Sequence, residues 1–178
     1  MISYGGKELA SAFRTVRKNT IQVAEDIPEP KYGFVAAPEV RSVARMLTHV
    51  AIATRIFEEA HKKRLTTLVG FDFFGMMDRF NAEEAKTRSK AEILELLRTE
   101  GEEFAAWMET LTPEFLAEMV TEPDGKTQKS RFERLLGAKE HEMHHRAQLM
   151  LIERKLGVVP HLTRQFNERV AQMRAARA

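Results

Sequence analysis

The hydrophobic positions of this chain recur mostly at helical spacing. Leu9, Phe13, Val16 and Val23 are separated by four, three and seven residues, which predicts a first helix over about residues 6–24. The segment "DIPEP" follows, and its two prolines end the helix, because proline has no backbone N–H to donate.

Three further long helices are predicted over residues 38–63, 89–112 and 130–156. The first of these starts at a proline, which suits the first turn of a helix. The other two start at Ser-x-x-Glu capping boxes, in which serine and glutamate satisfy N–H groups of the first turn. A glycine follows the last of the three, as is common at helix ends.

The remaining segments are short. Residues 65–85 are rich in phenylalanine and contain two glycines, so we expect a connector with one helical turn. "PEFLAEMV" predicts a short helix, "TEPDGKTQ" a loop, and residues from 163 onward another short helix. No segment shows convincing strand alternation. The pattern predicts an all-α fold, a single domain over residues 1–178 built as an antiparallel four-helix bundle with short extra helices.

Composition narrows the class of protein. A chain of 178 residues with 43% hydrophobic and 30% charged residues suits one soluble domain. A net charge of +2 gives no reason to expect nucleic acid or a membrane as a partner. The absence of cysteine excludes disulfides, thiolate ligands and a cysteine nucleophile. No apolar run resembles a signal peptide or a membrane span, so we expect a cytoplasmic protein.

Three histidines lie on faces that should be buried. His141 and His145 interrupt an otherwise apolar stripe of the last long helix, one turn and ~40° apart, so their imidazoles can share an ion. His49 lies on the apolar face of the second helix, also near its middle. Together they predict a three-nitrogen metal site with open positions. The alternative is that they are hydrogen-bonded core residues.

The other histidines are expected nearer to solvent. His144 lies to one side of the predicted ligands, at the rim, whereas His61 and His161 should face solvent. Glu142 is expected on the helix flank, paired with Arg146 four residues later. At the rim, Glu142 and His144 are candidate proton carriers for catalysis.

Two rival metal sites fit the sequence less well. Residues 141–145, "HEMHH", contain the H-E-x-x-H pattern of zinc proteases, but no sheet is predicted upstream and the pattern does not continue as HxxGxxH. The spacing of Glu168 would suit a downstream zinc ligand, but no other feature of the sequence supports that role. A di-iron bundle needs two Glu-x-x-His pairs at one level. Residues 58–61 lie ~16 Å along the helix from that level, so the di-iron site is a remote alternative.

The segments "APEVRSVARMLTHVAIATRIF" and "KEHEMHHRAQLMLIERKLG" resemble the DinB/YfiT-like family of metalloenzymes, the DinB superfamily. The family pattern, one histidine in the second helix and His-x-x-x-His in the last long one, falls on His49, His141 and His145. The resemblance implies a four-helix bundle that is often a homodimer and carries a divalent ion such as nickel or zinc. Ala147 departs from the glycine that is frequent there and adds bulk at a helix contact.

Two hypotheses for function follow. The first is a metal-dependent enzyme acting on a small molecule. Because the chain has no cysteine, the nucleophile must be external: water in a hydrolase, or a low-molecular-weight thiol in an S-transferase or isomerase, as the resemblance suggests. The second is a non-catalytic, metal-stabilised helical dimer used in binding or stress response. The homodimer is expected through exposed apolar surface on the long helices. No cofactor pocket in the sequence separates the two hypotheses.

Overall fold

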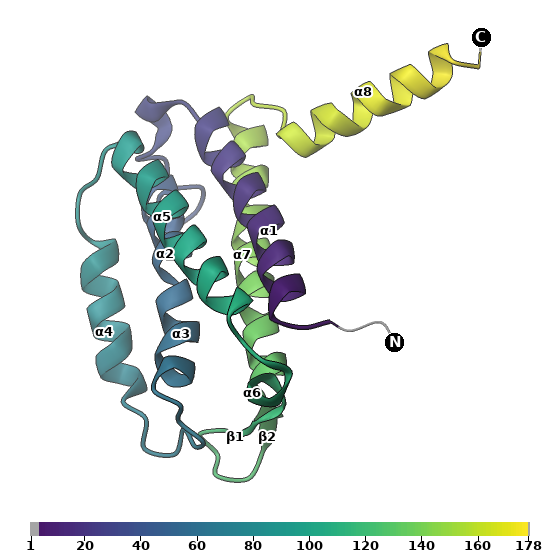
Figure 1. Cartoon of the computed structure of the whole chain (residues 1–178). Coiled ribbons are helices and arrows are strands. Elements are labelled where there is room, and N and C mark those ends of the chain that lie inside the picture. The colour runs from purple at the N-terminus through teal and green to yellow at the C-terminus, as the bar shows by residue number, and fades with distance from the viewer. Residues whose placement is uncertain (1–3, 178) are drawn as a thin grey trace.

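The computed structural model describes residues 4–177 and is a four-helix bundle (Figure 1). Its helices are α1 (Gly6–Asp26), α2 (Val43–Ile52) continued by α3 (Thr54–Lys62), α5 (Lys90–Glu109) and α7 (Arg131–Lys155). Helices α1 and α2 each pack on both α5 and α7, while α3 completes the same side of the bundle as α2. The predicted fold class is therefore confirmed.

Smaller elements surround the bundle. These are a 3₁₀ turn (Glu29–Lys31), α4 (Phe73–Glu84), α6 (Pro113–Ala117), strands β1 (Met119–Thr121) and β2 (Gln128–Ser130), and α8 (His161–Ala175). Helix α4 lies outside the bundle against α2, and α8 extends away from it (Figure 1). Within residues 4–177, no helix combines the length and apolar character that crossing a bilayer requires.

The centre of the bundle contains the two largest apolar clusters of the core, with a polar layer between them. One cluster contains Val23, Leu97 and Leu149, and the other contains Phe13 and Phe104. On α1, α5 and α7 the buried residues between the clusters are mostly small or polar. Because water is excluded at this level, polar groups there need partners within the protein.

The predicted second helix differs from the structure at its start and middle. Helix α2 begins after Ser42, whose hydroxyl accepts a hydrogen bond from the Arg45 N–H at 3.3 Å. Pro38 lies in the preceding loop, where Glu39 has a positive φ of 62° that a helix cannot accommodate. At Ala53 the helix tightens, since the Ile56 N–H bonds to the Ala53 carbonyl three residues back.

Two predictions for the connecting segments were wrong. Residues 65–85 contain the twelve-residue helix α4, capped by the Asp72 carboxylate, which accepts from the Gly75 N–H at 2.9 Å. Residues 119–130 form an antiparallel hairpin with Gly125 at a φ of 70° in its turn, where the end of a short helix and a loop over residues 121–128 were expected. Strands of three residues are too short for their alternation to be visible in sequence. Both predicted capping boxes, at Ser89 and Ser130, are confirmed.

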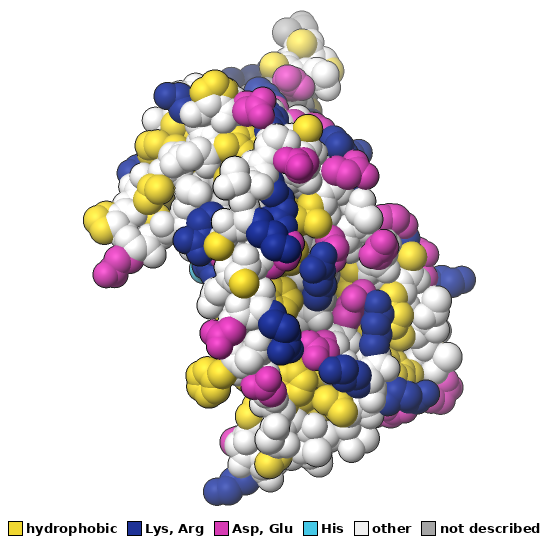
Figure 2. Space-filling model, turned by 90° about the vertical axis from the view of Figure 1, so that its left-hand side faces the viewer, with side chains coloured by type: hydrophobic (Ala, Val, Ile, Leu, Met, Phe, Trp, Pro, Cys, Tyr) yellow, Lys and Arg dark blue, Asp and Glu magenta, His cyan; other side chains and the backbone are white. Residues whose placement is uncertain are grey.

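The outer surface mixes charges of both signs. Figure 2 shows the face of the molecule on which α4 lies, where basic and acidic side chains alternate with apolar ones between them. No single-sign patch dominates this face. On α4, Phe74 is strongly exposed.

Candidate metal centre

The three predicted histidines come together inside the bundle. His49 comes from α2, and His141 and His145 come from successive turns of α7. One ring nitrogen of each lies within 4.8 Å of the others, and the Nε2 atoms of His49 and His141 are 3.0 Å apart. The two α7 imidazoles lie 4.6 Å apart between ring centroids. The structure thus confirms the convergence that the apolar stripes predicted.

Two side chains outside this group orient its imidazoles. The Glu84 Oε1 atom lies 2.5 Å from His49 Nδ1, and the Gln148 Oε1 atom lies 2.9 Å from His145 Nδ1. Both oxygens can only accept, so each Nδ1 carries the proton and each Nε2 presents a lone pair to the centre. Carboxylate and amide oxygens commonly orient metal-binding histidines in this way.

Sequence analysis missed Glu84. It lies in α4, in the segment that was predicted to be a connector, and no periodicity marks it as inward-facing. Its side chain is fully buried, and it is paired with Arg41, whose Nε lies 2.8 Å from Oε2. Burial raises the pKa of Glu84, but hydrogen bonds from His49 and Arg41 outweigh it and hold the pKa at about 2. Glu84 is therefore ionised near neutral pH.

The environment also keeps the two α7 imidazoles neutral. Burial, followed by the charges of the neighbouring His145 and His49, lowers the pKa of His141 to about 4. Burial likewise lowers the pKa of His145, against a raising effect from its hydrogen bond with Gln148. Neutral imidazole is the form that binds a metal ion.

The donor set fits a divalent ion. Nitrogens bound at about 2.0–2.1 Å to a tetrahedral ion are about 3.3 Å apart, close to the 3.0 Å separation of His49 Nε2 and His141 Nε2. Three imidazoles leave at least one coordination position for another ligand. Among the described residues, this is the group of three or more potential ligands that lie close enough to share an ion.

The two candidate proton carriers occupy different environments. His144 is exposed at the edge of the site, as expected, and its Nε2 accepts from Gln148 Nε2 at 3.2 Å. The predicted position of Glu142 was wrong: its side chain is 2% exposed, and Arg17 Nε lies 3.0 Å from both of its oxygens. Arg146 donates instead to the Val16 carbonyl at 3.4 Å. Glu142 is thus a core residue and not a rim residue.

The predicted exposure of His61 and His161 was also wrong. His61 is buried beside Arg131, with Nδ1 3.2 Å from a guanidinium nitrogen. His161 is buried where α8 meets α1, with Nε2 3.1 Å from the Asn19 side-chain oxygen. The sequence placed His161 in a loop, but it is the first residue of α8, and the helix junction covers it.

The geometry also weighs against the two rival sites. In H-E-x-x-H proteases the glutamate acts as general base beside the metal, whereas Glu142 here faces Arg17 in the core. Glu168 lies on an exposed part of α8. The second Glu-x-x-His pair of the di-iron hypothesis is engaged elsewhere, since Glu58 pairs with Lys62 and His61 contacts Arg131.

A cavity of about 360 Å³ opens beside the histidines. Its wall includes His145 and Gln148 at one end, and it continues along α7 toward the end of that helix. This volume falls in the usual range of small-molecule sites. The three-histidine centre is therefore adjacent to space that a small ligand can enter.

A family model and solved structures resemble the chain. The model of the DinB superfamily matches residues 12–149. A DinB-like protein of Bacillus subtilis, YjoA, is 22% identical, with a TM-score of 0.63 over 84% of this chain and 92% of that one. None of the curated proteins matches.

Two more distant structures share the fold. YfiT from Bacillus subtilis, described as a probable metal-dependent hydrolase with an unusual four-helix bundle topology, is 16% identical, with a TM-score of 0.67 over 89% of this chain and 91% of its own. An uncharacterised protein from Clostridium difficile 630 is 14% identical, with a TM-score of 0.65 over 86% of this chain and 98% of its own. At these identities the similarity shows the fold.

Proposed function

This chain belongs to the DinB superfamily, and on that premise we propose that it is a metal-dependent enzyme in which His49, His141 and His145 bind one divalent ion. The observation that carries the proposal is the convergence of three ring nitrogens within 4.8 Å, two of them on rings held by Glu84 and Gln148. Imidazole ligands suit zinc and nickel, which are the ions we expect. When bound, such an ion supplies Lewis-acid chemistry and makes a small ligand more acidic.

The protein's own residues prepare the site for this ion. Glu84 and Gln148 orient His49 and His145, so little rearrangement is needed on binding. The ionised Glu84 places a negative charge next to the site, and Arg41 balances part of it on the solvent side.

We assign proton transfer at the solvent edge to His144. Its ring is exposed, lies 5.0 Å from the ring of His145 between centroids, and accepts a hydrogen bond from Gln148. With Nε2 occupied as an acceptor, the neutral ring carries its proton on Nδ1. Histidine is suited to this role because its imidazole can both donate and accept a proton. Replacement by glutamine should lower the rate without reducing metal content.

The reaction we propose is hydrolysis of a small molecule. The adjacent cavity and the open coordination position support this class, as does the description of YfiT, which shares the fold, as a probable metal-dependent hydrolase. A thiol-dependent transfer differs only in the external nucleophile. The same assay therefore tests it, by adding glutathione, bacillithiol or mycothiol to each substrate.

The first experiment measures metal content. Protein purified without added metal, and protein loaded with zinc or nickel and then desalted, are analysed for metal by mass spectrometry. We expect one ion per chain in the wild type and a clear loss in His141→Ala. His144→Ala is the matched control on the same helix and should retain the ion. Equal metal content in wild type and His141→Ala would overturn the proposal.

The second experiment separates an enzyme from a metal-stabilised binding protein. Loaded protein is screened against small esters and amides, with and without the three thiols, beside the His141→Ala variant. Turnover that depends on His141 supports the enzyme. A protein that holds its ion stoichiometrically and shows no turnover in any arm supports the non-catalytic alternative.

A further inference from the structure

The cavity beside His145 extends along α7. Its lining residues on α7 run from His145 and Gln148 to Leu151, Ile152 and Lys155. Ten residues of helix correspond to about 15 Å. The cavity therefore has a metal-centre end and a distal end, and an elongated ligand has to lie along α7 to occupy it.

The middle of this cavity is apolar. It is lined by Leu151 and Ile152 of α7, by Met46 of α2, and by Ala36 and Val40 of the preceding loop. Leu151 is 60% exposed, so its side chain is available for contact with a ligand. Such a wall favours a ligand with a hydrocarbon or aromatic body, because burying this surface is favourable.

The distal end is cationic. Lys155 Nζ makes a long contact of 3.4 Å with the Ala36 carbonyl, and among residues 4–177 no carboxylate lies within ion-pair distance of it. Arg41 also lines the cavity, but its guanidinium is engaged with Glu84. Glu39 is an acidic residue of the same wall. Of the two cations that line the cavity, Lys155 is the one not engaged with Glu84.

We propose that this cavity binds small organic anions. The apolar body of the ligand lies between α7 and the 36–40 loop, and its anionic group contacts Lys155 at the end opposite the histidines. The assignment of this ligand as substrate rests on the proposed metal-dependent function. The ligand class itself rests on the cavity and can be measured without any turnover.

Two matched dyes test the ligand class. 8-Anilinonaphthalene-1-sulfonate and N-phenyl-1-naphthylamine share one aromatic body, and only the first carries a sulfonate. Fluorescence titration gives the Kd of each dye for the full-length, zinc-loaded protein. In Lys155→Met we expect the Kd of the anionic dye to rise about threefold to tenfold, with that of the neutral dye unchanged. The difference should shrink at high salt.

Three variants locate the effect. Lys155→Arg keeps the charge and should retain the affinity for the anionic dye. Lys139→Met removes a lysine elsewhere on α7 and should change neither Kd. Leu151→Asn should weaken both dyes, which places them in this cavity and not on exposed apolar side chains of α8. An unchanged anionic-dye Kd in Lys155→Met, or unchanged Kd values in Leu151→Asn, would overturn the inference.

The metal-dependent function and the anion-binding cavity can be tested independently of each other. Metal analysis of Lys155→Met should match wild type, because Lys155 lies about 15 Å along the helix from His145. Loss of anion discrimination with normal metal content therefore supports the cavity assignment. If the wild type takes up no ion yet shows Lys155-dependent dye binding, the metal-dependent function fails and the anion site stands.

Discussion

Arg17 and Glu142 form a buried ion pair at the centre of the bundle, with Arg17 Nε 3.0 Å from each carboxylate oxygen. The same guanidinium donates to the Leu97 carbonyl at 2.7 Å and to the Val50 carbonyl at 3.1 Å. One side chain of α1 thus bonds to α2, α5 and α7. Gly101 makes room for it, since a Cβ there would lie 2.8 Å from Arg17 Cγ. This pair forms the polar layer between the two apolar clusters.

We expect Glu142→Ala to destabilise the fold by about 3–5 kcal/mol, because it leaves the Arg17 charge buried without its partner. Urea unfolding followed by circular dichroism measures the change. The double variant Arg17→Met/Glu142→Leu should recover much of the loss, since it removes both charges. If Glu142→Ala is as stable as wild type, the ion pair is not the structural element that its burial indicates.

Glu84→Gln should weaken metal binding about tenfold to a hundredfold, because it removes the charged acceptor that orients His49. Competition with a metal-binding dye measures the affinity. Glu83→Gln, one residue earlier on α4, is the matched control and should bind as wild type. If the two variants bind the metal ion with equal affinity, Glu84 pairs with Arg41 but does not orient His49 for metal binding.

The inward histidines were predictable because a helix has a fixed period. An apolar stripe on α7 shows which of its positions are buried, and His141 and His145 occupy such positions. Glu84 was not predictable, because its burial results from the packing of α4 on α2, a tertiary contact without a sequence period. The 65–85 segment lacks a clear apolar stripe, so even its helix was missed.

The position of Glu142 was predicted wrongly because a local pattern was followed. Its neighbours on α7 suggest a surface pair at four-residue spacing, yet its partner is 125 residues away on α1. Local patterns describe contacts within one helix, whereas the Arg17 pair depends on how four helices meet. The predicted exposure of His61 and His161 was wrong for the same reason, since the elements that cover these two side chains lie far away in sequence.

Stability should depend on pH through Glu153. This α7 side chain is fully buried, and neither of its oxygens has a hydrogen-bond partner within the described chain. Burial, and then the charge of Asp26, raise the pKa of Glu153 to about 7. The folded state therefore binds this proton more tightly than the unfolded state, whose pKa is near 4.5, so ionisation costs stability as pH rises from about 4.5 to 7.

We expect Glu153→Gln to stabilise the protein more at pH 8 than at pH 5, by up to roughly 3 kcal/mol. Thermal melting at the two pH values measures the difference. Glu140→Gln, an exposed position on the same helix, should show no such dependence. An equal effect of Glu153→Gln at both pH values would contradict the raised pKa.

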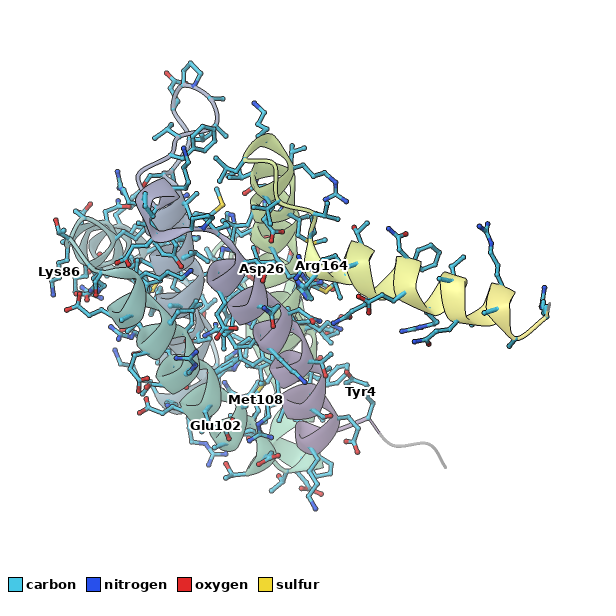
Figure 3. The ribbon with its side chains drawn as sticks, turned by 90° about the horizontal axis from the view of Figure 1, so that it is seen from above. Tyr4, Asp26, Lys86, Glu102, Met108 and Arg164 are labelled. Atoms are coloured by element: carbon cyan, nitrogen blue, oxygen red, sulfur yellow. The ribbon has the colours of Figure 1, made fainter. Side chains whose placement is uncertain are left out.

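We expect a homodimer in which α8 takes part. Helix α8 is tied to the bundle near its start, by His161 to Asn19 and by Arg164 to Asp26 at 2.7 Å, where Figure 3 shows it leaving the bundle. Beyond this junction Phe166 is 63% exposed. A helix of fifteen residues without tertiary packing is marginal in water, so a second copy that covers it would stabilise it.

Light scattering at micromolar concentration tests this prediction. Wild type should run as a dimer, and a chain ending at residue 164 should run as a monomer with unchanged metal content. A wild-type monomer would show that α8 has no partner in a second copy.

The ion should stabilise the fold without being required for it. A ligand that binds only the folded state adds RT ln(1 + [L]/Kd), about 2.7 kcal/mol at a hundredfold excess over Kd. The apolar clusters and capped helices remain when the ion is removed, in contrast to a zinc finger. We therefore expect a chelator to lower the Tm of wild type by several degrees while far-UV helicity at 25 °C persists. His141→Ala should melt at the same temperature with and without chelator, because it holds no ion to lose. Unfolding of wild type by chelator at room temperature would make the site structural, whereas identical melting of metal-free wild type in both conditions would make the three histidines ordinary core residues.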